Sequence, residues 1–203
     1  MKIFAIGRNY SEHIAELNNE RPDEPVIFTK PDTALLKKNQ PFYYPDFSED
    51  VHFELELVLK IGREGKNIQK KFSHKYYDQI GLGVDFTARD LQQKAKEKGL
   101  PWDIAKGFNG SAPISDFKPV GDYSDLSDIN FKLMVNGGER QIGNTSHMLF
   151  SFDYIVSYLS RFFTLKKGDL IFTGTPKGVS AVNVGDRLEG YIEDEKLLDF
   201  VVK

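Results

Sequence analysis

The stretch His52-Phe53-Glu54-Leu55-Glu56-Leu57-Val58-Leu59 alternates polar and apolar side chains through Leu57, with the two-residue period of a β-strand. One face of this strand would carry His52, Glu54 and Glu56, and the other would carry Phe53 and leucines. The two carboxylates would stand about 6.5 Å apart. On a buried face such a pair needs a cation, which predicts a metal site. A solvent-facing strand with two surface glutamates is the commoner meaning of an isolated Glu-x-Glu, and the spacing alone leaves both open.

Strand patterns dominate the rest of the chain as well. Short apolar runs rich in β-formers lie at 26–28, 53–61, 80–85, 129–135, 170–173, 187–192 and 197–202. The turn Asn136-Gly137-Gly138 predicts a hairpin between its flanking runs. Helical spacing indicates three helices, over 11–17, 87–98 and 151–163. Many strands, few helices and no regular βα alternation predict an α+β, mainly β fold with helices covering one side of a sheet.

Length and composition narrow the class of protein. With 203 residues and a net charge of −3, the chain reads as one domain over 1–203, and its basic residues are spread among acids, which argues against nucleic-acid binding. No run approaches the ~18 apolar residues of a membrane span. The first ten residues hold no signal-peptide core, so we expect a cytoplasmic protein. Cysteine is absent, which leaves only oxygen and imidazole as metal ligands.

Asp85 follows a glycine-containing apolar run at the point where a helix is expected to begin. It is a candidate third oxygen ligand, with Arg89 and Gln92 of the following helix facing the same cleft. Asp85 or Thr87 as a plain helix cap is the alternative. Three carboxylates without cysteine suit Mg²⁺ or Mn²⁺.

Three further positions carry polar groups that suit chemistry. His13 and Glu16 stand three residues apart on a short helix, where the carboxylate could orient the imidazole to deprotonate water; an exposed surface pair is the alternative. Lys106 is a lone cation in an apolar segment, and a surface lysine is its alternative. The segment 173–178 lacks the phosphate-loop spacing, but its backbone N–H groups and Thr175 could hold a carboxylate; a plain tight turn fits equally.

Taken together and in this order, the motifs resemble the fumarylacetoacetate hydrolase family. The resemblance rests on Gly7-Arg8-Asn9-Tyr10 with His13 and Glu16, Phe28-Thr29-Lys30-Pro31, the segment 52–57, Asp85-Phe86-Thr87-Ala88-Arg89-Asp90, Lys106, and Thr173-Gly174-Thr175-Pro176-Lys177-Gly178-Val179. Gly99-Leu100-Pro101-Trp102 and Arg140-Gln141 with Thr145-Ser146 look most like the small acylpyruvate hydrolase and oxaloacetate decarboxylase branch.

The resemblance implies a mixed β-roll, β-barrel-like fold with a few covering helices, a metal-dependent site and a homodimer. It assigns the site residues as follows: Glu54, Glu56 and Asp85 as ligands of Mg²⁺ or Mn²⁺; His13 and Glu16 as a water-activating dyad on a lid; Lys106 as a charge-stabilising lysine; and Arg8, Arg89, Gln92 and Thr175 as substrate-binding residues. The polar segment 12–24 is expected to close over the bound substrate.

The activity that the resemblance implies is divalent-metal-dependent cleavage of a C–C bond in short 2,4-dioxo acids, giving pyruvate and a carboxylate, with oxaloacetate decarboxylation or tautomerisation as related activities. A bound metal would stabilise the enolate that all of these reactions share. A 2-hydroxyhepta-2,4-diene-1,7-dioate isomerase is the alternative enzyme, and a non-catalytic protein that binds a metal and an oxo acid is the alternative of another class. The pair His13 and Glu16 favours catalysis, because binding alone does not need it.

Overall fold

The computed structural model describes residues 1–11, 16 and 21–203. Most of the predicted helix over 11–17 and most of the predicted lid over 12–24 lie outside the described residues. His13 is among the residues left out.

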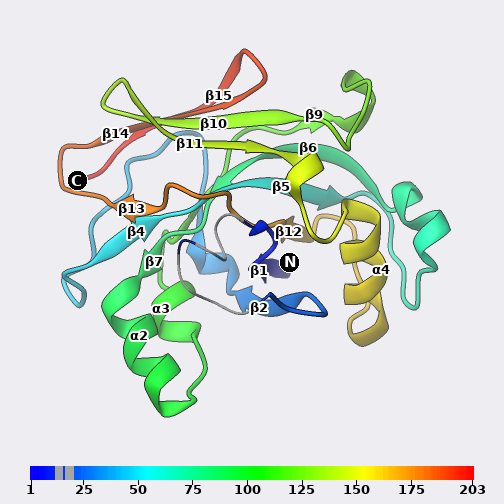
Figure 1. Ribbon diagram of the computed structural model, residues 1–203, viewed down its shortest axis with the longest axis horizontal. Coiled ribbons are helices and arrows are strands. Elements are labelled where there is room, and N and C mark those ends of the chain that lie inside the picture. The colour runs from blue at the N-terminus through cyan, green and yellow to red at the C-terminus, as the bar shows by residue number, and fades with distance from the viewer. Residues whose placement is uncertain (12–15, 17–20) are drawn as a thin grey trace.

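A six-stranded mixed sheet forms the middle of the molecule, as Figure 1 shows. Its strands, in spatial order, are β2 (Val26–Lys30), β1 (Ile3–Gly7), β12 (Leu170–Phe172), β5 (Leu55–Ile61), β6 (Tyr77–Val84) and β9 (Lys118–Pro119). β1 and β12 run parallel, whereas the other pairs in this sheet are antiparallel. The sheet therefore brings the first strand of the chain beside one of the last.

A second, antiparallel sheet lies above the first in Figure 1. Its order is β11 (Gly138–Asn144), β10 (Asn130–Val135), β14 (Arg187–Ile192) and β15 (Glu195–Val201). The predicted hairpin joins β10 to β11, and its corner residues Asn136 and Gly137 have φ of 53° and 76°, the left-handed conformation that such a tight turn needs.

Two smaller sheets complete the strand arrangement of the described residues. One contains β13 (Ser180–Ala181), β4 (Val51–Phe53) and β7 (Thr87–Ala88), and the other contains β3 (Leu35–Leu36) and β8 (Ala112–Pro113). The α+β, mainly β prediction is confirmed. The described strands form several sheets and no closed barrel.

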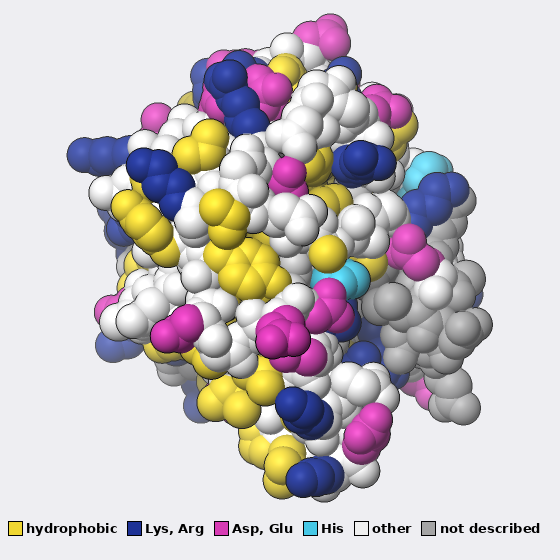
Figure 2. Space-filling view, turned by 90° about the vertical axis from the view of Figure 1, so that its left-hand side faces the viewer, with side chains coloured by type: hydrophobic (Ala, Val, Ile, Leu, Met, Phe, Trp, Pro, Cys, Tyr) yellow, Lys and Arg dark blue, Asp and Glu magenta, His cyan; other side chains and the backbone are white. Residues whose placement is uncertain are grey.

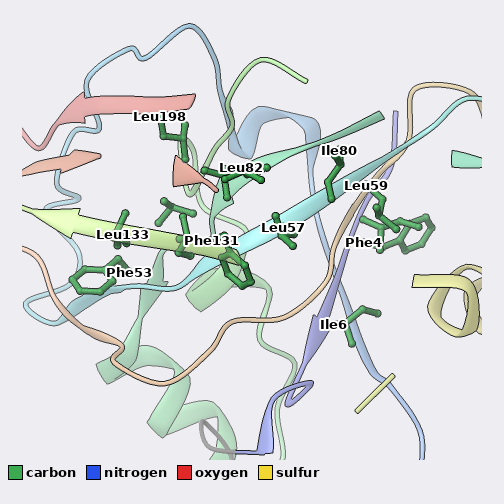
Figure 3. Packing of buried hydrophobic residues seen from close by; sticks show 14 of the residues in the cluster. Phe4, Ile6, Phe53, Leu57, Leu59, Ile80, Leu82, Phe131, Leu133 and Leu198 are labelled. Carbon is green, nitrogen blue, oxygen red and sulfur yellow. The ribbon is translucent and has the colours of Figure 1, made fainter. Parts of the chain in front are cut away.

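The core fills the space between the two larger sheets. Figure 3 shows side chains of both sheets facing one another. Leu57 and Leu59 of β5 and Ile80 and Leu82 of β6 belong to the same buried cluster as Phe131, Leu133 and Leu198 of the second sheet. Apolar area removed from water contributes roughly 25 cal/mol per Å², so this contact stabilises the position of β5, the strand that begins beside Glu54.

The helices lie at opposite sides of the sheets in Figure 1. α2 (Arg89–Lys98) and the short α3 (Asp103–Lys106) lie together near β4 and β7, and α4 (Phe152–Phe162) lies on the far side. Ser151 caps α4, accepting a hydrogen bond from Tyr154 N at 3.4 Å. α2 ends, as predicted, before Gly99, whose φ is 65°.

The start of α2 differs from the prediction. Thr87 and Ala88 pair with β4 as strand β7, so the helix begins only at Arg89. Its N-cap is Ala88, which offers no side-chain hydrogen bond. Neither Asp85 nor Thr87 therefore caps this helix, and the carboxylate of Asp85 is left for other contacts.

The strand predicted over 53–61 is broken at Glu54. β4 ends at Phe53 and pairs with β7, whereas β5 starts at Leu55 and joins the six-stranded sheet. The backbone around the break is held from two directions, since Asp85 N donates to Glu54 O at 2.8 Å and Leu55 N donates to the Gln141 side chain at 2.8 Å. The break places Glu54 at the junction of two sheets.

The surface shown in Figure 2 carries mixed charge. Lysine and arginine side chains lie among aspartate and glutamate side chains on this face and form no continuous stripe of described residues. No helix in the described part of the chain is long and apolar enough to cross a membrane.

Candidate active site

Three carboxylates converge inside the molecule where β4 and β6 end and β5 begins. Oxygen atoms of Glu54, Glu56 and Asp85 lie within 4.8 Å of one another. Their residues are 6%, 2% and 0% exposed, so the alternative of a solvent-facing Glu-x-Glu is wrong. Three anions this close and this dry must be balanced by positive charge.

Lys106 supplies part of that balance from the last position of α3. Its Nζ donates to Glu54 Oε2 at 2.9 Å and to Asp85 Oδ2 at 2.8 Å. The residue is buried, so it is not a surface lysine. Burial acts to lower the pKa of Lys106, but the carboxylates of Asp85 and Glu54 outweigh it and hold the pKa above its ordinary value. Lys106 is therefore a charged group inside the cluster.

A second lysine, Lys30, was not among the predicted site residues. It ends β2, is fully buried, and its Nζ lies 2.6 Å from Asp85 Oδ1. The same ammonium donates to the backbone oxygens of Lys106, Ser111 and Phe86. Burial is the main cause of a lowered pKa for Lys30. The sequence feature that could have identified Lys30 is its position at the end of an apolar strand, directly before Pro31.

The cluster fits a hard divalent cation. The contact between Lys30 and Asp85 lacks hydrogen-bond geometry, so the buried Asp85 Oδ1 accepts no hydrogen bond from any residue that the structure describes. Burial first, and then the charges of Asp85 and Glu54, raise the pKa of Glu56 well above its ordinary value. Three buried carboxylates whose oxygens converge within 4.8 Å are the donor set that Mg²⁺ and Mn²⁺ prefer.

A narrow pocket of about 40 Å³ opens onto the carboxylates. Besides them it is lined by Ile6, Gly7, Arg8, Phe28, Arg89, Gln92, Lys96, Trp102, Lys106 and Thr175. The four residues predicted to bind substrate, Arg8, Arg89, Gln92 and Thr175, are therefore all brought to this pocket. Phe28 and Trp102 pack edge to face, with ring centroids 5.9 Å apart, and give the pocket an aromatic wall.

Arg89 joins the pocket wall to the cluster. Its Nη2 donates to Glu54 Oε1 at 2.7 Å, and its Nη1 donates to Gln92 Oε1 at 2.8 Å. Arg8 has a φ of 59°, a left-handed conformation that is strained for a side chain of this kind and is typical of functional sites. Both arginines thus direct positive charge toward the pocket.

Lys96 adds to this charge and was also missed. Burial, followed by the charges of Arg89 and Arg8, lowers its pKa. Arg89, Gln92 and Lys96 stand at i, i+3 and i+7 on α2 and so share one face, a spacing that could have identified Lys96 from the sequence. The mouth of the pocket is suited to an anionic molecule.

The glycine-containing segment 173–178 borders the pocket on the other side. Gly174 N donates to Glu56 Oε2 at 2.6 Å, and Gly178 N donates to Glu16 Oε1 at 3.0 Å. We expected these N–H groups to serve an incoming carboxylate; both instead hold carboxylates of the protein. Thr175 is buried and lines the pocket, so its hydroxyl is the group left to meet a ligand.

The two remaining sequence patterns are His13 with Glu16, of which only Glu16 is described, and His52 beside Glu54, of which only Glu54 lines the pocket. Glu16 is described and is held by Gly178, whereas its predicted partner His13 lies outside the described residues, so the dyad stays a prediction. His52 shares a sequence pattern with Glu54 and Glu56 but bonds Asp50 Oδ1 at 2.8 Å and does not line the pocket.

Comparisons with known proteins find matches over nearly the whole chain. Residues 2–200 match the family model described as fumarylacetoacetate (FAA) hydrolase C-terminal. The chain is 42% identical to "Oxaloacetate tautomerase FAHD1, mitochondrial" of Rattus norvegicus, over 99% of this chain and 91% of the relative. It is 43% identical to "Oxaloacetate decarboxylase, mitochondrial" of Dictyostelium discoideum, over 91% of this chain and 85% of the relative.

A solved structure extends the comparison to three dimensions. The crystal structure of fumarylpyruvate hydrolase from Pseudomonas aeruginosa in complex with Mn²⁺ and pyruvate matches with a TM-score of 0.94 and 36% identity, covering 100% of this chain and 89% of the other. These relatives are named as enzymes, and the match of a family model to nearly the whole chain is decisive. The chain belongs to the fumarylacetoacetate hydrolase family.

Proposed function

We propose that this chain is a divalent-metal-dependent enzyme of short 2-oxo acids, with the keto–enol tautomerisation of oxaloacetate as its first reaction. The observation that carries the proposal is the convergence of Glu54, Glu56 and Asp85 beside Lys106 at the base of a small pocket. The names of the relatives from rat and Dictyostelium support the same choice.

Glu54, Glu56 and Asp85 would hold Mg²⁺ or Mn²⁺, which when bound would polarise the keto group of the substrate and favour negative charge on its oxygen. Magnesium remains our first candidate from the ligand chemistry, while Mn²⁺ is the ion in the complex of the Pseudomonas hydrolase. Metal titration of the purified protein distinguishes the two ions.

The residues around the cluster bind and orient the substrate. The Thr175 hydroxyl donates to its carboxylate next to the keto group, and Arg8 with Arg89 and Gln92 binds the second carboxylate at the pocket mouth. Lys106, held between two carboxylates, adds a fixed positive charge close to the reacting carbons. Trp102 and Phe28 exclude water from one wall.

Proton transfer is assigned to His13 and Glu16. Tautomerisation of oxaloacetate moves a proton between C3 and the C2 oxygen, and a positioned acid–base pair speeds such a step by roughly 10²- to 10⁴-fold. The Gly178 N–H fixes the Glu16 carboxylate, which in turn would orient the His13 imidazole.

Hydrolysis of an acylpyruvate is the second candidate reaction, and the anchored Glu16 favours it. The same dyad would take a proton from the water that attacks the C4 carbonyl; cleavage of the C3–C4 bond then yields pyruvate and a carboxylate. In oxaloacetate, cleavage of the C3–C4 bond releases CO₂ without attack by water. A dienedioate isomerase and a non-catalytic binding protein remain as outcomes of the test.

The test is an assay of metal-stripped protein with oxaloacetate and with acetylpyruvate, each with and without Mg²⁺ or Mn²⁺. Loss of the oxaloacetate enol is followed by its ultraviolet absorbance, and pyruvate is followed by a coupled dehydrogenase. Because free divalent ions also promote these reactions, the rate with metal alone is subtracted. The proposal expects metal-dependent enol exchange above that background; no reaction above background with either substrate would overturn it.

Three broader expectations belong to the same proposal. We propose that residues 1–203 form one catalytic domain, since the buried core combines Phe4 with Val202. The homodimer implied by the family is testable by light scattering on a sizing column. We expect a cytoplasmic location, whereas the relatives from rat and Dictyostelium are named as mitochondrial. Fractionation of the source cells decides between the two locations.

A further inference from the structure

We infer that Gln141 is a positioning residue that aims the Thr175 hydroxyl into the pocket and holds the backbone of Leu55, which lies between the candidate metal ligands Glu54 and Glu56. It lies on β11, in the second sheet, and is 1% exposed. The inference rests on the proposed function in one respect, the role of Thr175 in binding substrate.

The side-chain amide of Gln141 makes three hydrogen bonds across the junction of the sheets. Its Oε1 accepts from Leu55 N at 2.8 Å. Its Nε2 donates to Thr175 Oγ1 at 2.8 Å and to Pro176 O at 3.0 Å. The backbone N–H of Leu55 is only a donor, so the amide oxygen must face it and the amide nitrogen must face Thr175. The orientation of this amide is therefore fixed by its partners.

This orientation determines where the Thr175 hydroxyl can point. The oxygen of Thr175 accepts the hydrogen from Gln141, so its own proton is not used in that contact. None of the residues that the structure describes accepts this proton. Thr175 is 3% exposed and lines the pocket, which leaves a pocket ligand as the acceptor. Gln141 thus makes Thr175 a donor toward an anionic or carbonyl oxygen.

The Oε1 atom of Gln141 holds the backbone beside the carboxylate cluster. Leu55 separates Glu54 from Glu56, and its N–H has left the ladder of β4 because the strand breaks there. Gln141 satisfies this buried donor and so holds the backbone from which both carboxylates project. One side chain therefore sets the spacing between the candidate metal ligands and the substrate hydroxyl.

The loop that carries Thr175 is packed closely against the same strand. Gly178 has a φ of 95°, and a Cβ on it would lie 2.2 Å from the backbone oxygen of Arg140, the residue before Gln141. β11 and the segment 173–178 are thus in direct backbone contact. This contact keeps Gln141 within reach of Thr175.

The substitution Q141E separates the two ends of the amide. A carboxylate has the same shape and can still accept from Leu55 N, but it cannot donate to Thr175 Oγ1 or to Pro176 O, and it would instead draw the threonine proton away from the pocket. We expect the KM for oxaloacetate to rise about tenfold to a hundredfold, as for T175V, with a smaller change in kcat. The affinity for Mn²⁺, measured by electron paramagnetic resonance, should not weaken more than about threefold, because the bond to Leu55 remains.

A double-mutant cycle tests whether Gln141 acts through Thr175. The variant Q141E/T175V should have a KM within about twofold of T175V alone. If the two effects on KM multiply instead, Gln141 does not act through Thr175 and the inference is wrong. Q141A, which loses both ends of the amide, should also weaken Mn²⁺ binding. Q141M carries the same KM prediction if Q141E does not fold. E139Q, at an exposed position of β11, is the matched control and should have no effect.

The outcomes also separate this inference from the proposed function. If T175V leaves the KM unchanged, the substrate-binding role of Thr175 fails, whatever Gln141 does. If T175V raises the KM but Q141E does not, the role of Thr175 stands and the inference about Gln141 is overturned.

Discussion

Lys30 and Asp85 form an ion pair inside the protein, with Nζ and Oδ1 2.6 Å apart and side chains 0% and 1% exposed. The pair joins the end of β2 to the end of β6, two strands that are not neighbours in the sheet. Breaking a buried pair by removing one partner leaves a charge without compensation. Lys30 therefore holds Asp85 in place beside the other two carboxylates.

The substitution K30M tests this role. It should lower the stability of the metal-free protein by about 3–5 kcal/mol, the usual cost of breaking a buried ion pair. Thermal denaturation measures the change. Mn²⁺ should raise the melting temperature of K30M more than that of the unchanged protein, because the ion replaces part of the missing positive charge.

The matched control is K196M on the surface. Lys196 bonds Glu189 and Asp199 at positions that water reaches, so its removal should shift the melting temperature far less. Equal shifts for K30M and K196M would show that the buried pair has no special importance.

The variant E56Q should have opposite effects with and without metal. Burial and two neighbouring carboxylates disfavour the charged form of Glu56, as its raised pKa indicates. A neutral amide at this position should therefore stabilise the metal-free protein. The same change removes a ligand, so Mn²⁺ should no longer raise the melting temperature, as scanning calorimetry would record. A metal-dependent shift as large as that of the unchanged protein would contradict the assignment of Glu56 as a ligand.

Gly178→Ala should reduce turnover. The added Cβ would collide with the backbone oxygen of Arg140, so the loop must shift and Gly178 N can no longer hold Glu16. We expect kcat for oxaloacetate to fall about tenfold or more, in line with the loss of an oriented acid–base group. Gly121→Ala is the control, since a Cβ there meets no neighbour. A normal kcat in a folded Gly178→Ala protein would show that the anchoring of Glu16 by Gly178 is not needed for the reaction.

Asp199 should govern part of the acid stability of the second sheet. Hydrogen bonds from Arg187 and Lys196 lower its pKa from 3.8 to about 2. A carboxyl group whose folded-state pKa is lowered stabilises the protein above its unfolded pKa, and this contribution is lost as the pH falls from about 4 to about 2. D199N should therefore flatten the loss of stability across this pH range in denaturant titrations. R187M should flatten it as well, and an unchanged acid slope in both variants would be the contrary result.

Much of the site was predictable because local patterns placed it. The alternation through Glu54 and Glu56, together with an acid at the end of the strand 80–85, predicted three carboxylates at one place, and the structure brings them together. The face of α2 that carries Arg89 and Gln92 points to the same pocket. Each of these signals lies within one segment of about ten residues.

The parts that sequence patterns missed depend on contacts between distant segments. Lys30 and Gln141 are 55 and 56 residues away from Asp85 in sequence, on opposite sides of it, and no local pattern says that Lys30 pairs with Asp85 or that Gln141 bonds Leu55 and Thr175. The break at Glu54 also depends on distant segments, because β4 pairs with β13 and β7 whereas β5 pairs with β12 and β6. Long-range packing overrides local strand propensity at this junction.

The most direct test of the account is the binding of Mn²⁺ to the metal-stripped protein, followed together with oxaloacetate tautomerisation in the same titration. The account predicts one Mn²⁺ per chain, turnover that rises in parallel with occupancy, and loss of both in E56Q and in D85N. Full turnover by the metal-stripped protein, or unchanged Mn²⁺ binding in E56Q and D85N, would contradict it.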